Sequence, residues 1–230
     1  MRELIIPESG PKRILLSAAE HLFATKGFEA VSVRDVTQAV KTNVAAVNYH
    51  FGSREQMLSL VILRYAIPVN EERLARLASA ERKFAGKSLP VEEIIEAFVR
   101  PIIGQSRKTE LPEGLFYQLL GRIFAANGDG LSQQFEENFS QVSDRFMRAL
   151  GKALPTLAPE ELGSRYHLIN GGLIHLLTHQ ELLGKREGSP PTMEASLGRL
   201  IRFNAAGLRE GVAAEADAPV QKEPQETFNF

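Results

Sequence analysis

The chain has 230 residues, a formal net charge of −1 and no cysteine. The lack of cysteine excludes disulfides and thiolate chemistry, and the near-neutral charge means that any nucleic-acid surface must be local. Apolar runs are far too short to span a membrane, and Met1–Gly10 does not resemble a signal peptide, so we expect a cytoplasmic protein with no membrane partner.

The first predicted helix ends at Gly27. Glycine adopts the left-handed conformation at a helix C-terminus without strain, so it is a common stop signal. The residues before it recur at the spacing of one helix face, which predicts an amphipathic helix packed against a core. These apolar residues are Ile14, Leu15, Ala18, Ala19, Leu22 and Phe23.

Two short helices joined by a tight turn are predicted next. Ser32 followed by Asp35 is typical of a helix N-terminus, and Lys41-Thr42 forms the turn. Asn43 is a suitable N-cap for a second short helix over residues 44–50. Ser53 and Gln56 then match the capping box of a third helix. This arrangement, braced by the preceding amphipathic helix, is that of a helix-turn-helix DNA-binding unit.

The second short helix has a surface suited to a DNA groove. Ala45 and Ala46 are small enough for close approach, while Asn48 can pair with adenine through two hydrogen bonds. The alternative is a generic helical hairpin in which Tyr49 and His50 only pack. Phosphate contacts are expected from rings and from basic residues around the motif. The residues expected to contact DNA are Ser32, Arg34, Lys41, Thr42, Asn43, Val44, Ala45, Ala46, Asn48, Tyr49, His50 and Arg54.

The rest of the chain is also helical in pattern. One long helix is predicted from Ser53 to about Lys83, with a kink or break at Pro68, which makes Pro68 a candidate hinge. Further apolar stripes and helix-ending signals bring the total to about nine helices, and no segment alternates as a strand would. The class is therefore all-α, with a three-helix N-terminal unit and a larger helical domain. Residues 213–230 are expected to form a disordered tail.

The N-terminal quarter resembles the tetracycline-repressor (TetR/AcrR) family. Its AAxxLFxxxGF-like first helix and LYYHFxSKExL-like junction are matched here by Ala18, Ala19, Leu22, Phe23, Gly27, Phe28, Val47, Tyr49, His50, Phe51, Ser53 and Arg54. The family usually has glycine where this chain has Lys41, so Lys41 is expected to need a left-handed conformation that costs about 1 kcal/mol. The resemblance implies DNA binding over residues 1–52 and ligand binding and dimerisation over residues 53–212.

In that family the last two long helices form the dimer and the middle helices hold an inducer pocket. The resemblance therefore implies a homodimeric repressor of a palindromic double-stranded DNA operator, with interface helices at His167–Leu183 and Met193–Leu208. Gly171, Gly172, Ala205, Ala206 and Gly207 would allow close helix approach, and Leu173, Leu176, Leu197 and Leu200 would supply apolar area. The alternative is that these helices pack only on their own subunit.

A small apolar effector is expected in the helical domain. The segments FYQLLGRIFAA and RFMRALGKALPTL are similar to the branch of fatty-acid-responsive regulators, which suggests an acyl ligand. The polar end of the ligand would bind to Arg100, Arg122, Asn170 or His175. The predicted ligand-binding residues are Phe98, Ile102, Phe116, Leu120, Ile123, Phe139, Phe146, Asn170 and His175.

No catalytic or metal constellation is visible in the sequence. His175 and His179 lie four residues apart, but no carboxylate completes a convincing metal site, and no cofactor-binding fingerprint is present. The remaining alternatives are an all-helical enzyme or ligand carrier without a specific DNA site, and a sequence-independent architectural protein. The first would need a paired acid and base, and the second a basic surplus.

Overall fold

The fold was analysed in a computed structural model, which describes residues 9–85, 87–126, 133–179 and 191–210. The expected all-α class is confirmed, since every regular element in these ranges is a helix. The helices are α1 (Pro11–Lys26), α2 (Val33–Ala39), α3 (Val44–Phe51), α4 (Arg54–Lys83), α5 (Val91–Val99), α6 (Pro101–Ser106), α7 (Glu113–Ala125), α8 (Gln133–Ala153), α9 (Pro159–Thr178) and α11 (Met193–Arg209). Only Arg100 separates α5 from α6, so these two segments form nearly one helix.

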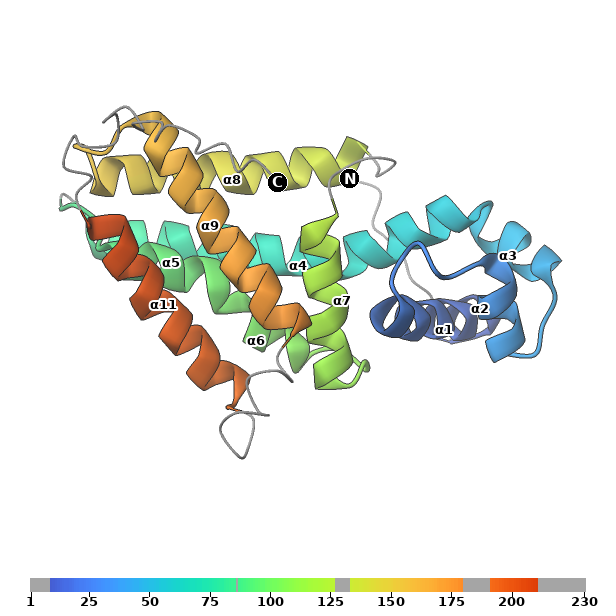
Figure 1. The fold of residues 1–230 in the computed structure, drawn as a ribbon. Helices are drawn as coiled ribbons and strands as arrows, with labels where there is room; N and C mark the ends of the chain where they lie inside the picture. The colour runs from blue at the N-terminus through green and yellow to red at the C-terminus, as the bar shows by residue number, and fades with distance from the viewer. Residues whose placement is uncertain (1–8, 86, 127–132, 180–190, 211–230) are drawn as a thin grey trace, which may run out of the picture.

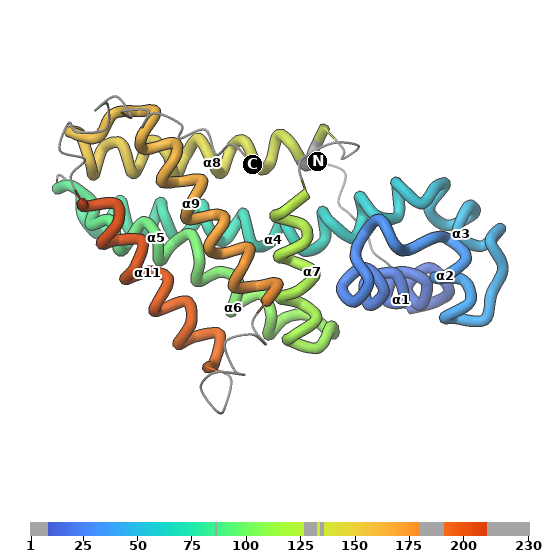
Figure 2. Tube along the Cα trace, in the orientation of Figure 1, coloured from blue at the N-terminus to red at the C-terminus, as the bar shows by residue number. Residues whose placement is uncertain are grey.

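The molecule has two parts joined by α4 (Figure 1). Helices α1–α3 form a small group at the N-terminal end of α4, which we call the head (residues 9–52). The remaining helices surround the rest of α4 and form the body (residues 53–210 where described). Figure 2 shows that α4 runs from the head into the body. A displacement of this helix would therefore change the packing in both parts.

The core of the body is built from apolar stripes. Phe146 and Leu150 of α8 and Leu173 of α9 are almost fully buried, as the helical periodicity predicts. The packing is close, because a Cβ on Gly121 of α7 would lie 2.7 Å from Thr178 of α9. Helix α11 packs on α5 and α9, which closes the bundle on the side that faces the viewer in Figure 1.

Pro68 does not break α4, which is helical without interruption from Arg54 to Lys83. Proline has no backbone N–H, so one helical hydrogen bond to the carbonyl of Arg64 is missing. The packing of α5–α8 along the helix keeps the segment helical despite this loss. The expected tail over 213–230 and the end of the expected helix at Leu183 lie outside the described residues.

Candidate functional site

The start of α2 is fixed by a reciprocal cap. The backbone N–H of Asp35 donates to the Ser32 hydroxyl at 3.2 Å, and the Ser32 N–H donates to the Asp35 carboxylate at 2.8 Å. The Ser32 hydroxyl also donates to that carboxylate, and these bonds lower the pKa of Asp35. The predicted N-terminus is therefore present, with the Ser32 side chain committed to the cap.

The turn between α2 and α3 uses a left-handed lysine. Lys41 has φ of 55°, as expected for the position at which related proteins carry glycine. The Lys41 N–H donates to Gln38 O at 3.2 Å and the Thr42 N–H to Thr37 O at 2.9 Å. These two bonds are the pair found in a Schellman motif, in which the C′ residue must be left-handed. The side chains of Lys41 and Thr42 both remain exposed.

Helix α3 is anchored on one side and open on the other. The Asn43 side chain accepts a hydrogen bond from Ala46 N–H at 3.0 Å and so caps the helix. Val47 and Phe51 are buried against the head core. Tyr49, in contrast, is 85% exposed, and its ring contacts only the neighbouring His50 ring edge-on among the described ring pairs. The same outward surface includes the exposed residues Val44, Ala45 and Asn48, beside the half-buried Ala46 and His50.

The basic residues near α3 have different roles. Arg34 is exposed on α2, the helix that precedes α3. Arg54 instead donates to the backbone carbonyl of Val31 at 2.7 Å and to that of Phe28. Its guanidinium therefore ties the α1–α2 loop to the start of α4, a role that the sequence analysis did not anticipate. Lys12 was also missed, and its ammonium lies 5.8 Å from the centre of the Phe51 ring.

Polar contacts join the head to the body. Arg122 of α7 donates to the carbonyl oxygens of Ala24 and Thr25 at 3.2 and 3.5 Å, at the C-terminal end of α1. Glu20 of α1 pairs with Arg64 of α4 at 2.8 Å. Burial raises the pKa of Glu20, and the positive charges of Arg64 and Arg13 partly oppose that rise. Arg122 is thus engaged with the end of α1 in the head.

The predicted ligand-binding residues separate into two groups. Asn170 and His175 differ from the aromatic members: Asn170 is half-buried and donates to Tyr166 O at 2.8 Å, and His175 is exposed with its ring stacked on His179. The aromatic members do come together, since the Phe98 and Phe146 rings lie 5.1 Å apart. Phe139 is half-buried, and the fully buried members of the set are Phe98, Ile102, Phe116, Leu120, Ile123 and Phe146.

Arg73 is an internal cation that the sequence analysis missed. It is only 2% exposed, and its guanidinium lies 4.0 Å from the centre of the Phe98 ring and 4.6 Å from that of Phe124. Burial lowers its pKa to about 10, which leaves it charged at neutral pH. An arginine in the charged pattern of α4 resembles a solvated residue, so little in the sequence distinguishes this position.

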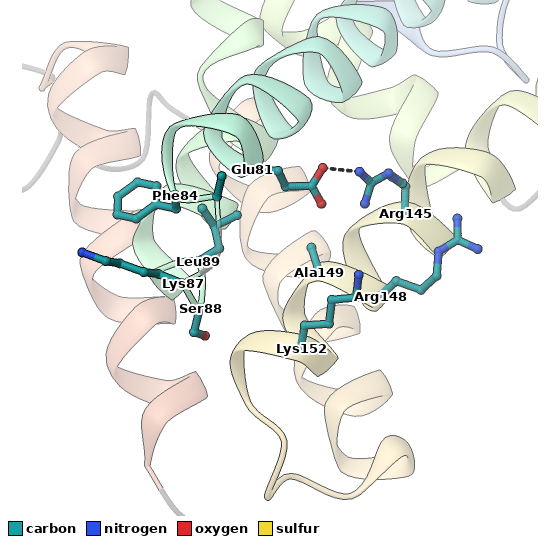
Figure 3. Close-up of a pocket in the computed structure, with 10 residues that line it drawn as sticks. Glu81, Phe84, Lys87, Ser88, Leu89, Arg145, Arg148, Ala149 and Lys152 are labelled. Carbon is teal, nitrogen blue, oxygen red and sulfur yellow. Dashed lines mark hydrogen bonds and ion pairs between the residues drawn. The ribbon is translucent and has the colours of Figure 1, made fainter.

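The cavities that open on the body contain few of the predicted residues. One of about 120 Å³ is lined by Phe116 of the predicted set together with Pro68 and Gln105. A larger one of about 540 Å³ lies between the C-terminal ends of α4 and α8 and contains none of the predicted residues (Figure 3). Figure 3 shows its basic wall, with Arg145 paired to Glu81 and Arg148 and Lys152 beside them.

The outer face of α9 and α11 exposes large apolar residues. Leu168 is 69% exposed and Phe203 is 78% exposed, although both belong to helices that are otherwise well packed. The residues expected to supply apolar area at a dimer interface lie elsewhere: Leu173, Leu176 and Leu197 are buried within the subunit. Leu200 is half-buried and sits over Gly172, so the close approach expected there occurs between α9 and α11 of one chain.

No helix in the described ranges has the length and apolarity needed to cross a membrane. Within those same ranges, no three histidine or acidic side chains cluster in a way that could hold a metal ion.

Comparisons with known proteins agree with the architecture. Residues 15–61 match the bacterial regulatory proteins of the tetR family, and residues 96–207 match the tetracyclin repressor-like C-terminal domain. No curated protein matches the chain significantly.

Several solved structures share the fold. PfmR from Thermus thermophilus, a TetR family transcriptional regulator, is 20% identical over 85% of this chain and 97% of its own, with a TM-score of 0.51. A putative tetR family regulator from Shewanella sp. PV-4 is 13% identical over 85% and 96%, with a TM-score of 0.54. AmtR from Mycobacterium smegmatis is 14% identical over 87% and 89%, with a TM-score of 0.51.

Proposed function

Because the chain belongs to the tetR family of transcriptional regulators, we propose that it is a repressor that binds a palindromic operator as a homodimer and is released by a small apolar effector. Residues 1–52 would form the DNA-binding domain and residues 53–212 the effector-binding and dimerisation domain, acting in the cytoplasm. The family is one of DNA-binding regulators that are generally not enzymes, and we propose no catalytic role.

The exposed surface of α3 carries the proposal for DNA binding. Its buried side is fixed by Val47 and Phe51, so the helix can present a rigid surface to the major groove. Tyr49 projects from this surface without cover, and Asn48 beside it can read a base edge. Arg34 and Lys41, both exposed, supply positive charge for phosphates on either side. Ser32, Thr42, Asn43 and Arg54 would act mainly by placing these groups.

The test is a gel shift on the chain's own upstream intergenic DNA at a stated salt concentration, with excess unrelated DNA. We expect a complex that resists the competitor and weakens at least tenfold in the Asn48→Ala/Tyr49→Ala double variant, because a base contact and a phosphate contact are lost. Arg82→Ala, at an exposed site on the far end of α4, is the matched control and should bind normally. Weak binding that salt and competitor abolish equally in all variants would instead favour a helical ligand carrier or enzyme.

The homodimer is supported by the exposed apolar face. Leu168 and Phe203 are large and uncovered on neighbouring helices, and patches of this kind commonly mark protein interfaces. Two recognition helices must also reach major grooves about 34 Å apart, which one chain cannot do. Light scattering of Leu168→Glu/Phe203→Glu should show a monomer with lost operator binding. His21→Glu, at an exposed site on α1, should remain dimeric. A wild-type monomer that still binds the operator would overturn this part of the proposal.

The effector is supported by the aromatic interior of the body. The Phe98 ring centre lies 5.1 Å from that of Phe146 and 5.7 Å from that of Tyr166, and the ring centres of Phe124 and Phe139 are also 5.7 Å apart. Such rings give large apolar contact area, as expected for an acyl or similar ligand. Loss of the gel shift on addition of a fatty acid would support release by an effector, and a strengthened shift would reverse the sign of the response.

A further inference from the structure

Arg73 has one nitrogen without a partner in the centre of the body. Its Nε donates to the carbonyl oxygen of Phe98 at 2.7 Å, and one terminal nitrogen donates to Asn70 Oδ1 at 2.9 Å. The other terminal nitrogen is buried and has no hydrogen-bond acceptor among the residues that the structure describes. Asn70 in turn donates to Asn138 Oδ1 at 2.6 Å, which fixes the side of the guanidinium that is already occupied.

The charge of Arg73 also has no counterion. Among the residues that the structure describes, no carboxylate forms an ion pair with it, although buried guanidinium groups normally have one. The aromatic rings of Phe98 and Phe124 attract the cation but carry no net charge. Removal of a charged group from water costs several kcal/mol unless an opposite charge and full hydrogen bonding compensate for it. An anion at the free nitrogen would supply both.

The other arginines expected to bind an anionic group are already occupied. Arg100 pairs with Glu96 at 3.0 Å and with Glu194, and Arg122 donates to the carbonyls at the end of α1. An anion that entered the aromatic interior would therefore meet the free nitrogen of Arg73.

We propose that Arg73 is the anchor for the carboxylate of a monoanionic effector whose apolar body lies among the surrounding phenyl rings. This inference rests on the proposed effector-binding function and names the chemical class that the site accepts. The carboxylate would accept from the free terminal nitrogen, in a charge-assisted bond of the kind that arginine forms best. The rings of Phe98, Phe124, Phe139 and Phe146 would contact the body of the ligand.

The position of Phe124 connects this site with the head. Its ring stacks on Arg73, and Arg122, two residues earlier on α7, holds the end of α1. A ligand that enters beside Arg73 must displace part of this tight packing, and Phe124 is half-buried at its edge. Movement of α7 would then alter the contact between Arg122 and the head. This gives a physical path from the carboxylate to the recognition helix.

Calorimetric titration with paired probes tests the proposal. Octanoate and phenylacetate are compared with octanamide and phenylacetamide, which have the same apolar bodies without the charge. We expect each acid to bind wild type at least tenfold more tightly than its amide. Arg73→Met should remove this preference, while Arg73→Lys, which keeps the charge but loses the planar fork, should retain part of it.

Two variants test where the acids bind. Arg76→Met removes an exposed arginine one turn away on α4, and Arg148→Met removes a cation from the open basic cavity of Figure 3. Both should keep the preference for acids. Loss of the preference in Arg148→Met would place the anion in the open cavity and overturn the proposal, as would equal affinity of acids and amides or no binding of either acid to wild type.

The gel shift without ligand separates this inference from the proposed function. Suppose that the operator is bound specifically but the tighter binding of acids over amides is absent or does not depend on Arg73. The proposed anion site is then wrong, and the proposed regulatory function is retained. If the acids bind through Arg73 but no specific operator complex forms, the ligand site stands and the proposed regulation fails.

Discussion

The head and the body satisfy their polar groups in different ways. In the head, Ser32 and Asn43 bond to backbone groups three residues away, and the buried positions Val36, Val47 and Phe51 are apolar. In the body, Arg73 lies in the core with one nitrogen unpaired. The buried charges of the head, Arg13 and Glu20, form ion pairs, although one Arg13 nitrogen also has no hydrogen-bond partner among the described residues. Arg73 has no counterion among those residues, so an anionic ligand is expected to act on the body, while the surface of α3 rests on locally satisfied groups. Substitutions at matched positions should reveal this contrast.

The largest effect is expected for Val47→Ala in the head. The side chain is completely buried beneath the recognition helix, and its loss removes apolar contact and leaves a cavity. The free energy of unfolding should fall by about 2 kcal/mol, measured by urea denaturation followed by circular dichroism. Ala45→Gly is a poor control because it alters helix propensity, so Val44→Ala, at a partly exposed site on the same helix, is preferred. Equal losses in the two variants would mean that the head core is not tightly packed.

Removal of a local cap should have a smaller effect. Asn43→Ala leaves the Ala46 N–H without its acceptor and should lower the free energy of unfolding by about 1 kcal/mol. Asn43→Ser should recover most of this loss in the same urea titration, because serine also caps helices well. A loss of operator binding in Asn43→Ser, with stability restored, would show that Asn43 contacts DNA and does more than cap the helix.

Lys41→Gly should change stability in the opposite direction. Glycine adopts the observed φ of 55° without strain, so the variant should gain about 0.5–1 kcal/mol in unfolding free energy. Operator affinity should nevertheless fall, and its dependence on salt should become shallower by about one unit of log–log slope, because one phosphate contact is lost. Lys41→Asn, which tolerates the left-handed conformation, should show the same loss of affinity. A decrease in stability would show that the Lys41 side chain has a structural partner.

The smallest effect is expected for Arg73→Met in the body. The variant loses two hydrogen bonds but also removes a buried charge that has no counterion. These contributions oppose each other, so without ligand the unfolding free energy should change by less than about 1 kcal/mol. Removal of one partner from a buried ion pair typically lowers the unfolding free energy by about 3–5 kcal/mol. A loss of that size in Arg73→Met would mean that Arg73 already has a charged partner and that the contrast between head and body is wrong.

The sequence predicted the local features of the head most accurately. The caps at Ser32, Asn43 and Ser53 follow from rules that involve residues three apart. The left-handed conformation of Lys41 was expected from the family resemblance, because the family usually has glycine at that position. Arg54 was harder to interpret because its carbonyl partner at Val31 lies 23 residues away. Sequence periodicity separates buried from exposed helix faces but does not identify the neighbour that covers a buried face.

That limit explains the differences in the body. Leu173 and Leu176 were expected to supply apolar area to a dimer interface, but the structure buries them within one subunit, as the alternative proposed. Leu168 and Phe203 lie outside that stripe and were not anticipated. Pro68 does not break α4, because tertiary contacts maintain the helix through it, while the expected kink at this residue stays a prediction. The aromatic cluster around Phe98 and Phe146 was anticipated, whereas Arg73 was not, because its burial depends on three other helices.

The contact between Arg122 and α1 has a consequence for modular engineering. The guanidinium holds two backbone oxygens, those of Ala24 and Thr25, and every residue type supplies such an oxygen. The exposed side chain of Thr25 can therefore vary without loss of this connection, whereas Ala24 is fully buried and must stay small. A chimera that joins the head of a related protein to this body should keep the contact between Arg122 and the first helix, provided that this helix ends at the same place opposite α7.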